Sequence, residues 1–293
     1  MSARPQLFQG IDDVRACVRA CRAAGESVGL VPTMGALHEG HLSLVRASRA
    51  ATTRTVVTIF VNPTQFGPDE DLDSYPRTLE ADLDALAALG VDAVFHPEPA
   101  VMYPDGDPFI QITPSVIDQN LCGLARPGHF QGVCTVVAKL FNIIPADKAF
   151  FGRKDAQQAA ILKRMVKDLD FPIEINICPI VREEDGLAMS SRNKYLESEE
   201  RAQATALSQA LAIGKQAIAD GERNSATLKQ VMKDSLSKSE LVHPEYVSIV
   251  DFNTFVDTET IGPSCLAAIA AQVGPARLID NMLIDGDTGE CEM

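Results

Sequence analysis

The sequence predicts an α/β fold, with a Rossmann-like parallel sheet in an N-terminal domain of residues 1–180 and a smaller α+β lid domain of residues 181–293. From residue 27 to about residue 178, short β-branched or apolar runs alternate with segments of helical period, as in βα units around a parallel sheet. After residue 180, helical segments precede strand-like runs, which favours a separate α+β unit. A chain of 293 residues with 46% apolar composition is long enough for two domains.

The first domain is expected to alternate strands and helices. The strands are expected at 27–31, 55–61, 91–95, 148–151 and 173–178, with an extra extended piece at 109–112. The helices are expected at 40–51, 77–89, 132–144 and 156–169. The second helix is the best marked, because Leu79, Leu83 and Leu86 share one face, Pro76 comes just before the first turn and Gly90 supplies a left-handed cap.

The second domain is expected to follow a hinge at residues 179–186. A long helix is predicted at 198–222 and another at 225–238, and strands are predicted near 245–251, 265–272 and 277–284. This order of helices followed by strands differs from the alternation in the first domain.

The composition excludes several classes of partner. The formal net charge of −14 and the pI near 4.8 argue against nucleic acid or an anionic membrane surface, since neutralising phosphates needs dense Lys and Arg. Any phosphate site is therefore expected to be a local basic pocket. The N-terminal stretch has scattered Arg and Asp in place of a signal peptide's apolar core, and no run approaches transmembrane length. We expect a cytoplasmic protein.

The cysteines predict no chemistry. There are seven, an odd number with no CxxC pair, which disfavours a disulfide framework and a thiolate metal site. Cys17 and Cys21 lie four residues apart on an expected helix, but they have no His or Cys partner that would suggest a ligand set. We interpret both as structural.

Four polar clusters follow predicted strands, at residues 32–41, 62–67 and 151–158 and at 188–193 in the segment after residue 178. In an open parallel sheet, ligands bind at the carboxyl ends of the strands, where helix N-termini present partial positive charge to anions. We therefore expect these clusters to meet at one edge of the sheet.

The first cluster contains a pair of histidines three residues apart at a helix start. Gly35 lets the backbone approach a ligand there, and His38 and His41 are expected to lie on one face and to donate to a bound phosphate. The alternative is that one or both histidines only cap the helix. A zinc protease site is disfavoured, because its motif needs His-Glu-x-x-His, whereas Glu39 here precedes Gly40.

The last cluster, Met189-Ser190-Ser191-Arg192, offers two hydroxyl donors and a guanidinium, which suit triphosphate oxygens. A Ser-rich turn with an Arg is by itself a common surface feature. Its conjunction with the histidine pair, about 150 residues earlier, is the stronger signal, because class I adenylating enzymes pair two such motifs.

Six segments resemble, in order and spacing, the pantothenate synthetases, a family of the nucleotidylyltransferase superfamily with its HxGH motif. They are PTMGALHEGHLSL, TIFVNPTQFGP, DSYPRTLEADL, RPGHFQGV, FGRKDAQQ and REEDGLAMSSRNKYL. The resemblance covers about residues 26–196. It implies a ligase in which pantoate attacks ATP to give pantoyl adenylate and pyrophosphate, and β-alanine then displaces AMP to form pantothenate.

The resemblance also implies the site residues. Pantoate falls on Gln65 and Gln158, and β-alanine on Gln65. Lys154 would neutralise phosphate and Asp155 would accept from ribose hydroxyls, while His41 matches the position usually assigned as proton donor. The expected catalytic residues are His38, His41, Lys154, Ser190, Ser191 and Arg192. The expected ATP site comprises Pro32, Met34, Gly35, Ala36, Leu37, His38, Glu39, Gly40, His41, Gly152, Arg153, Lys154, Asp155, Val181, Met189, Ser190, Ser191 and Arg192.

Two further residues and two departures complete the expected site. Arg126 and His129 would attract the anionic substrate at the entrance or help close the site, or would pair structurally at a helix N-terminus. The family usually has Glu at the place of Arg153 and an aromatic residue at the place of Ala156. Two neutral glutamines suit an acid whose carboxylate must stay nucleophilic.

ATP arrives with Mg²⁺, whose protein ligands the sequence does not name. Asp73 and Asp82 are candidates, against the alternative that both lie on a solvated helix face. The resemblance implies a homodimer, and the apolar segment 53–61 would offer an interface.

Three other functions remain as alternatives. A nucleotidylyltransferase acting on another acceptor would use the same histidine pair but needs a cationic acceptor site. A catalytically altered nucleotide-binding relative would retain the fold, and Arg153 and Ala156 motivate that hypothesis. An aminoacyl-tRNA synthetase is disfavoured by the acidic charge and the missing anticodon-binding mass.

Overall fold

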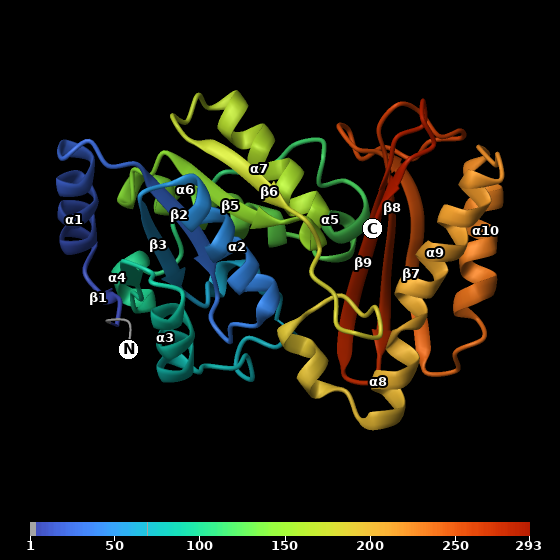
Figure 1. Cartoon of the computed structure of the whole chain (residues 1–293), viewed down its shortest axis with the longest axis horizontal. Helices are drawn as coiled ribbons and strands as arrows, with labels where there is room; N and C mark the ends of the chain where they lie inside the picture. The colour runs from blue at the N-terminus through green and yellow to red at the C-terminus, as the bar shows by residue number, and fades with distance from the viewer. Residues whose placement is uncertain (1–3, 69) are drawn as a thin grey trace. The chain divides into compact units, whose positions relative to one another are not determined.

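The computed structural model describes residues 4–68 and 70–293. The chain divides into two compact units, coloured by sequence in Figure 1. Unit 1 comprises Met1–Ser115, Arg126–Arg153 and Gln158–Pro179, and unit 2 comprises Val116–Ala125, Lys154–Gln157 and Ile180–Met293. Two short segments that precede residue 180 therefore belong to unit 2, so a single boundary along the sequence does not separate the units.

Unit 1 is built on a parallel six-stranded sheet in the order β1-β4-β3-β2-β5-β6. Its strands are β1 (Gln6–Phe8), β2 (Val28–Thr33), β3 (Arg54–Ile59), β4 (Ala93–Phe95), β5 (Lys148–Gly152) and β6 (Glu174–Cys178). The predicted parallel sheet is confirmed, and the five expected strands lie within two residues of their predicted bounds at each end. β1 pairs in parallel with β4 at the sheet edge, and its three residues were too few to show a period in the sequence.

Helices cover both faces of this sheet. α2 (Glu39–Ala51) and α3 (Leu79–Ala88) share one apolar cluster with the sheet, which includes Leu44, Val45, Val57, Leu83 and Leu86. The connections from β2 to β3 and from β3 to β4 run toward one edge of the sheet, whereas those from β1 to β2, from β4 to β5 and from β5 to β6 run toward the other. Because crossovers between parallel strands are right-handed, α1 (Ile11–Ala23), α6 (His129–Ile143) and α7 (Ala156–Asp168) lie on the face opposite α2 and α3.

The ends of these helices follow local backbone chemistry. Gly90 has φ +67° and caps α3 as predicted, although Thr78 rather than Pro76 directly precedes the helix. α6 starts three residues earlier than expected because Gly128, at φ +83°, turns the chain into it. The remaining short elements are η1 (Pro63–Gln65), α4 (Pro99–Met102), α5 (Leu121–Ala125) and η2 (Arg153–Asp155).

Two interpretations of apolar segments are wrong. Residues 109–112 form no strand, because no strand of the described chain pairs with them; Ile112 N–H donates instead to Thr135 Oγ1, at 3.0 Å. The segment 53–61 forms β3, whose two edges pair with β2 and β4 and whose residues 55–59 are buried. It therefore has neither a free edge nor an exposed face to offer as an interface.

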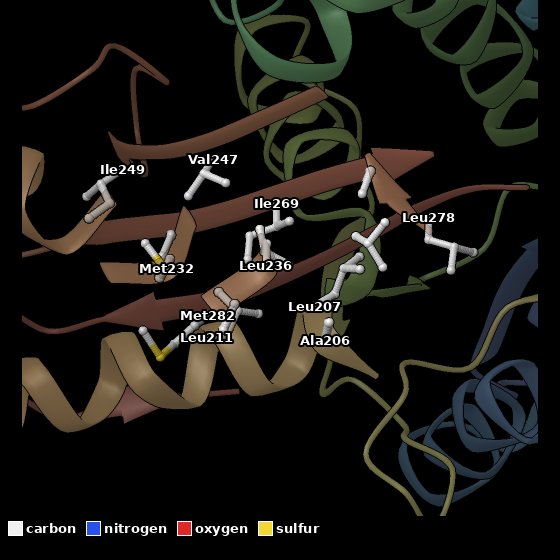
Figure 2. Close-up of a cluster of buried hydrophobic side chains, with 14 of the residues drawn as sticks. Ala206, Leu207, Leu211, Met232, Leu236, Val247, Ile249, Ile269, Leu278 and Met282 are labelled. Carbon is white, nitrogen blue, oxygen red and sulfur yellow. The ribbon is translucent and has the colours of Figure 1, made fainter. Parts of the chain in front are cut away.

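Unit 2 contains an antiparallel sheet in the order β10-β9-β8-β7, formed by β7 (Val242–Asp251), β8 (Cys265–Val273), β9 (Ala276–Ile284) and β10 (Cys291–Glu292). α9 (Ala206–Ala219) and α10 (Ser225–Leu236) lie side by side along it in Figure 1. Figure 2 shows the apolar side chains between them, including Leu207 and Leu211 of α9, Met232 of α10, and Ile269 and Met282 of the sheet. The expected α+β unit is confirmed.

The single helix expected at 198–222 is two helices, α8 (Ser198–Ala204) and α9. They meet at Thr205, whose Oγ1 donates to Ala202 O at 2.8 Å. A Thr hydroxyl that bonds to the preceding turn competes with the helical ladder, which accounts for the break. η3 (Ser191–Tyr195) lies before α8. Among the described residues, no helix is long and apolar enough to cross a membrane.

Candidate active site

The topology of unit 1 marks one edge of the sheet. β2 pairs with β3 on one side and with β5 on the other, and the chain leaves these two positions in opposite directions. The carboxyl ends of β2 and β5 thus form the topological switch point, where ligands bind in open α/β sheets. The loop after β2 begins at Met34 and leads into α2 at Glu39.

This loop has a left-handed backbone that a buried carboxylate holds. Gly35 has φ +81° and Ala36 has φ +50°. The Ala36 and Leu37 N–H groups donate to the two oxygens of Asp82, at 3.0 and 2.8 Å, and Thr78 Oγ1 donates to the same carboxylate. A Cβ on Gly35 would lie 3.0 Å from Ile59 Cγ2 and 3.1 Å from Asp82 Oδ2. Glycine is thus required here by conformation and by packing against β3 and Asp82.

Asp82 corrects a sequence interpretation. It does not lie on a solvated helix face, because it is only 3% exposed, and its oxygens are already accepting from the loop. It is therefore also a poor candidate for a Mg²⁺ ligand. Asp73 is exposed. Its carboxylate is not part of this arrangement.

His38 and His41 form a capping box at the start of α2. The Gly40 N–H donates to His38 Nδ1 at 3.2 Å, and the His38 N–H donates to His41 Nδ1 at 3.4 Å. The two ring centroids are 4.1 Å apart. The capping role considered from the sequence is therefore real, and the two rings do lie together.

The same bonds select one tautomer of each ring. Because Nδ1 accepts a hydrogen bond in both, a neutral ring carries its proton on Nε2 and offers an N–H donor there. Capping and donation to an anion thus use different nitrogens. Glu39, between the two histidines, pairs with Arg46 on the next turns of α2; this hydrogen bond, against a smaller opposing effect of burial, lowers the Glu39 pKa.

The loop after β3 brings a second polar group to the loop after β2. Gln65 Nε2 donates to Met34 Sδ at 3.3 Å, and Asn62 Nδ2 donates to Gln65 Oε1 at 3.0 Å. Asn62 is buried and accepts from the Tyr103 hydroxyl at 2.8 Å. A Cβ on Gly132 would lie 2.2 Å from Thr64 O, so only glycine lets α6 approach η1 this closely.

Arg126 and His129 belong to a chain of hydrogen bonds that ends at Gln65. Arg126 donates through Nε to Glu70 Oε1 at 2.7 Å and through Nη1 to His129 Nε2 at 3.0 Å. His129 Nδ1 donates to the Gln65 carbonyl at 2.9 Å. Burial raises the Glu70 pKa, but the bonds and charge of Arg126 outweigh it and the pKa is lowered. This is the structural pairing that the sequence left as an alternative to an entrance role.

The two departures from the family pattern follow β5. Arg153 is 3% exposed, so its guanidinium does not lie on the surface, and Ala156 is 4% exposed at the start of α7.

Two consecutive glutamines of α7 differ in their use. Gln157 is held by three backbone partners: it accepts from Cys122 N–H and donates to Ile117 O and Asn120 O, at 2.8 to 3.0 Å. Gln158 is half-buried, and its side-chain amide makes no hydrogen bond to any residue of the described chain. Gln157 is structural, whereas the Gln158 amide is available.

In unit 2, residues 181–189 form a hairpin that leads into the Ser-Ser-Arg segment. Met189 N–H donates to Val181 O at 3.0 Å, and the Ser190 hydroxyl accepts from Arg192 N–H at 3.3 Å as the cap of η3. Ser191 is only 6% exposed.

Lys154 and Asp155 lie in the short segment Lys154–Gln157, which also belongs to unit 2 and carries predicted site residues. Lys154 is half-buried and Asp155 is exposed, and the Lys154 side chain makes no ion pair with any residue that the structure describes. The predicted residues are thus brought together in two groups: Met34, Gly35, His38, His41 and Gln65 in unit 1, and Val181, Met189, Ser190 and Arg192 in unit 2.

Two residues that support the unit 1 group were not predicted in that role. Asn62 orients Gln65, and its place in NPTQFG directly after a strand was the available signal. Asp82 holds the loop after β2, and nothing in its acidic surroundings distinguished it. In residues 4–68 and 70–293, no group of three or more His, Cys, Asp or Glu side chains could hold a metal ion.

Comparison with known proteins shows to which family the chain belongs. The family model of the pantoate-beta-alanine ligases matches residues 6–283. The chain is 50% identical over 280 residues to the pantothenate synthetase of Thermotoga neapolitana, covering 95% of this chain and 99% of the relative. It is 52% identical over 269 residues to the pantothenate synthetase of Roseiflexus castenholzii, covering 91% of this chain and 96% of the relative.

Solved structures agree. The pantothenate synthetase of Thermus thermophilus superposes with a TM-score of 0.89 at 40% identity, covering 94% of this chain and 98% of the other. The pantoate-beta-alanine ligase of Francisella tularensis, solved in complex with β-γ ATP and β-alanine, superposes with a TM-score of 0.79 at 32% identity, covering 95% of this chain and 97% of the other. The chain belongs to the pantoate-beta-alanine ligase family.

Proposed function

We propose that this chain condenses (R)-pantoate with β-alanine, using ATP, to form pantothenate through a pantoyl-adenylate intermediate. The observation that carries the proposal is the His38–His41 pair at the carboxyl end of β2, with Gln65 against the same loop. The relative from Francisella tularensis, complexed with β-γ ATP and β-alanine, supports the choice of substrates.

In the first step, a pantoate carboxylate oxygen attacks the α-phosphorus of ATP. The bond from that phosphorus to the bridging oxygen breaks, and pyrophosphate leaves with the bonding electrons. Negative charge builds on the α-phosphate oxygens, so the Nε2–H groups of His38 and His41 stabilise the transition state more than the ground state. Neutral imidazoles do this without transferring a proton, which makes hydrogen bonding the primary role of both.

Gln65 and Gln158 bind pantoate in this proposal. Both are neutral amides, so they orient hydroxyls and carboxylate without clamping the charge that must attack. Asn62 orients the Gln65 amide, and the Glu70–Arg126–His129 chain holds its backbone. Gln65 also meets β-alanine in the second step.

In that step the β-alanine amine attacks the acyl carbon of pantoyl adenylate. The bond between the acyl carbon and the phosphate oxygen breaks, AMP leaves, and the amine gives up a proton to solvent. Adenylation makes this feasible, because AMP is a far better leaving group than hydroxide from a carboxylate.

Further ATP contacts come from unit 2. Lys154 neutralises phosphate charge, Asp155 accepts from the ribose hydroxyls, and Val181 with residues 189–192 completes the set. Mg²⁺ would be bound mainly by the phosphates of ATP, since it commonly keeps its waters and takes few protein ligands. It would neutralise phosphate charge there, and the donor set described above reserves no carboxylate cluster for it.

We also propose that two copies of the chain form a homodimer through residues 108–115. Phe109 and Ile110 are 93% and 85% exposed, in a segment with strand-like composition that pairs with no strand of residues 4–68 or 70–293. Residues 108–115 carry no charge in a chain of net charge −14, so this segment itself adds no charge repulsion between two acidic copies. Phe109→Asp with Ile110→Asp should give a monomer in light scattering, while Leu169→Asp, at another exposed apolar residue, should not.

The reaction is tested by product release. Enzyme, ATP, Mg²⁺ and pantoate should release pyrophosphate, and adding β-alanine should then release AMP. A nucleotidylyltransferase for another acceptor would release no pyrophosphate with pantoate. Absence of both products while ATP binds would mean that the chain is a nucleotide-binding relative without this activity.

A further inference from the structure

Two adjacent polar residues of β9 are buried in unit 2. Asp280 is 2% exposed and Asn281 is 3% exposed, opposite Ile269 and Ala268 of β8. Successive residues of a strand point to opposite faces of the sheet. The two side chains therefore contact different segments of unit 2, and both segments carry residues proposed above for ATP.

Asp280 anchors the hairpin that precedes the Ser-Ser-Arg segment. Arg182 donates to its two oxygens in a bidentate pair, at 2.7 and 3.0 Å, and also donates to Gly186 O at 3.0 Å. Arg182 lies one residue after Val181 and bridges to Ala188, one residue before Met189. The pair therefore ties the base of the hairpin to β9.

Asn281 anchors the other segment. Its Nδ2 donates to the Lys154 carbonyl at 2.9 Å, and its own N–H donates to Asp280 Oδ1 at 2.8 Å. The Lys154 carbonyl adjoins the side chain proposed to neutralise phosphate. The two anchors are themselves joined, so one strand sets the spacing between Lys154 and the hairpin.

Stability alone is a weak reason for this arrangement. Burying an Arg–Asp pair carries a desolvation cost that often cancels its attraction, and apolar residues of similar volume often fold as well. What the bidentate pair and the amide supply is a defined geometry for the two segments they hold. We propose that Asp280 and Asn281 are positioning residues for ATP, acting through Arg182 and the Lys154 backbone; this inference rests on the proposed function.

The test separates position from stability. Arg182→Met with Asp280→Leu replaces the pair by apolar side chains, and Asn281→Ala removes the uncharged carboxamide that donates to the Lys154 carbonyl. ATP binding is measured by calorimetry, and kcat and KM are measured for ATP and pantoate. We expect the KM and Kd for ATP to rise at least about tenfold, because small displacements of binding groups have such effects. The KM for pantoate should not change, since Gln65 and Gln158 belong to unit 1.

The matched control is Asp251→Asn. Asp251 lies on β7 of the same sheet and accepts from Asn253 and Thr254 in a turn that carries no proposed ATP residue. It should alter stability without altering the Kd for ATP. Folding of each variant is checked by circular dichroism and by Tm.

The outcomes are distinct. An unchanged Kd for ATP in the folded double variant, or in Asn281→Ala if the double variant does not fold, overturns the positioning role. A parallel fall in activity towards both substrates with no change in ATP affinity would likewise indicate a structural role. Failure of the wild-type chain to bind ATP would instead overturn the proposed function.

Discussion

Two buried aspartates hold the two loops to which we assign phosphate binding, and they do so by different bonds. Asp82 accepts directly from two backbone N–H groups of the loop after β2, whereas Asp280 accepts from the Arg182 guanidinium at the base of the hairpin. The first loop is thus held at its own backbone, and the second through one side chain. The first loop carries the histidines, whose donors we propose to meet the charge that develops in the reaction.

The largest expected effect tests whether the loop after β2 serves catalysis. His38→Asn keeps an N-cap acceptor for the Gly40 N–H but loses the imidazole donor. We expect kcat to fall about 100- to 1000-fold, as for removal of one oxyanion donor, with little change in unfolding free energy. Rate and urea denaturation are measured together.

His41→Ala is the companion variant. It should lose a similar factor in kcat and about 1 kcal/mol of stability, because the His38 N–H loses its acceptor. If His38→Asn retained wild-type kcat, capping would be the whole role of His38.

The next effect breaks the backbone support of the first loop. Asp82→Asn leaves one acceptor oxygen for two N–H groups, so one buried donor loses its partner. The expected loss is about 1–3 kcal/mol of unfolding free energy, together with weaker ATP binding. Asp280→Asn keeps a neutral acceptor for Arg182, so comparing the two variants by calorimetry measures how differently the loops depend on their aspartates.

A smaller effect is expected from Gly35→Ala. The left-handed φ of +81° and the contacts at 3.0 and 3.1 Å from the added Cβ both oppose alanine. We expect a loss of about 1–2 kcal/mol, from backbone strain, in chemical denaturation. Gly25 is the matched control, since its φ is +79° but a Cβ there meets nothing within 4 Å. An equal loss at both positions would assign the whole effect to φ.

The smallest effect concerns Glu70, a partly exposed carboxylate that supports the loop after β3. Its pKa is lowered in the fold, so its contribution to stability is present above the unfolded pKa of about 4.5 and is lost as pH falls through the folded value. Between about pH 6 and about pH 4, Glu70→Gln should therefore lose less stability than the wild type does. Identical pH dependence in urea titrations would exclude the Arg126 pair as a source of acid sensitivity.

The strands and helices of both units could be predicted because their signal is local. The β-branched run at 54–59 and the leucines of α3 needed no partner to be recognised. Predictions failed where a neighbour decides. Residues 109–112 have a strand's composition but meet no strand to pair with in the described part of the chain, and Thr205 ends a helix through one side-chain bond.

For the candidate site, the sequence by itself determined which chemical groups are present: two histidines three apart after the first long strand, two glutamines after later strands, and a distant Ser-Ser-Arg turn. Only the tertiary structure decided which polar residues are already occupied. It committed Gln157, Asp82 and Arg126 to internal partners and left the Gln158 amide without one in the described chain. The physical reason is that hydrogen bonds form between residues 35 to 127 positions apart, and no local pattern encodes which distant group will meet a given donor.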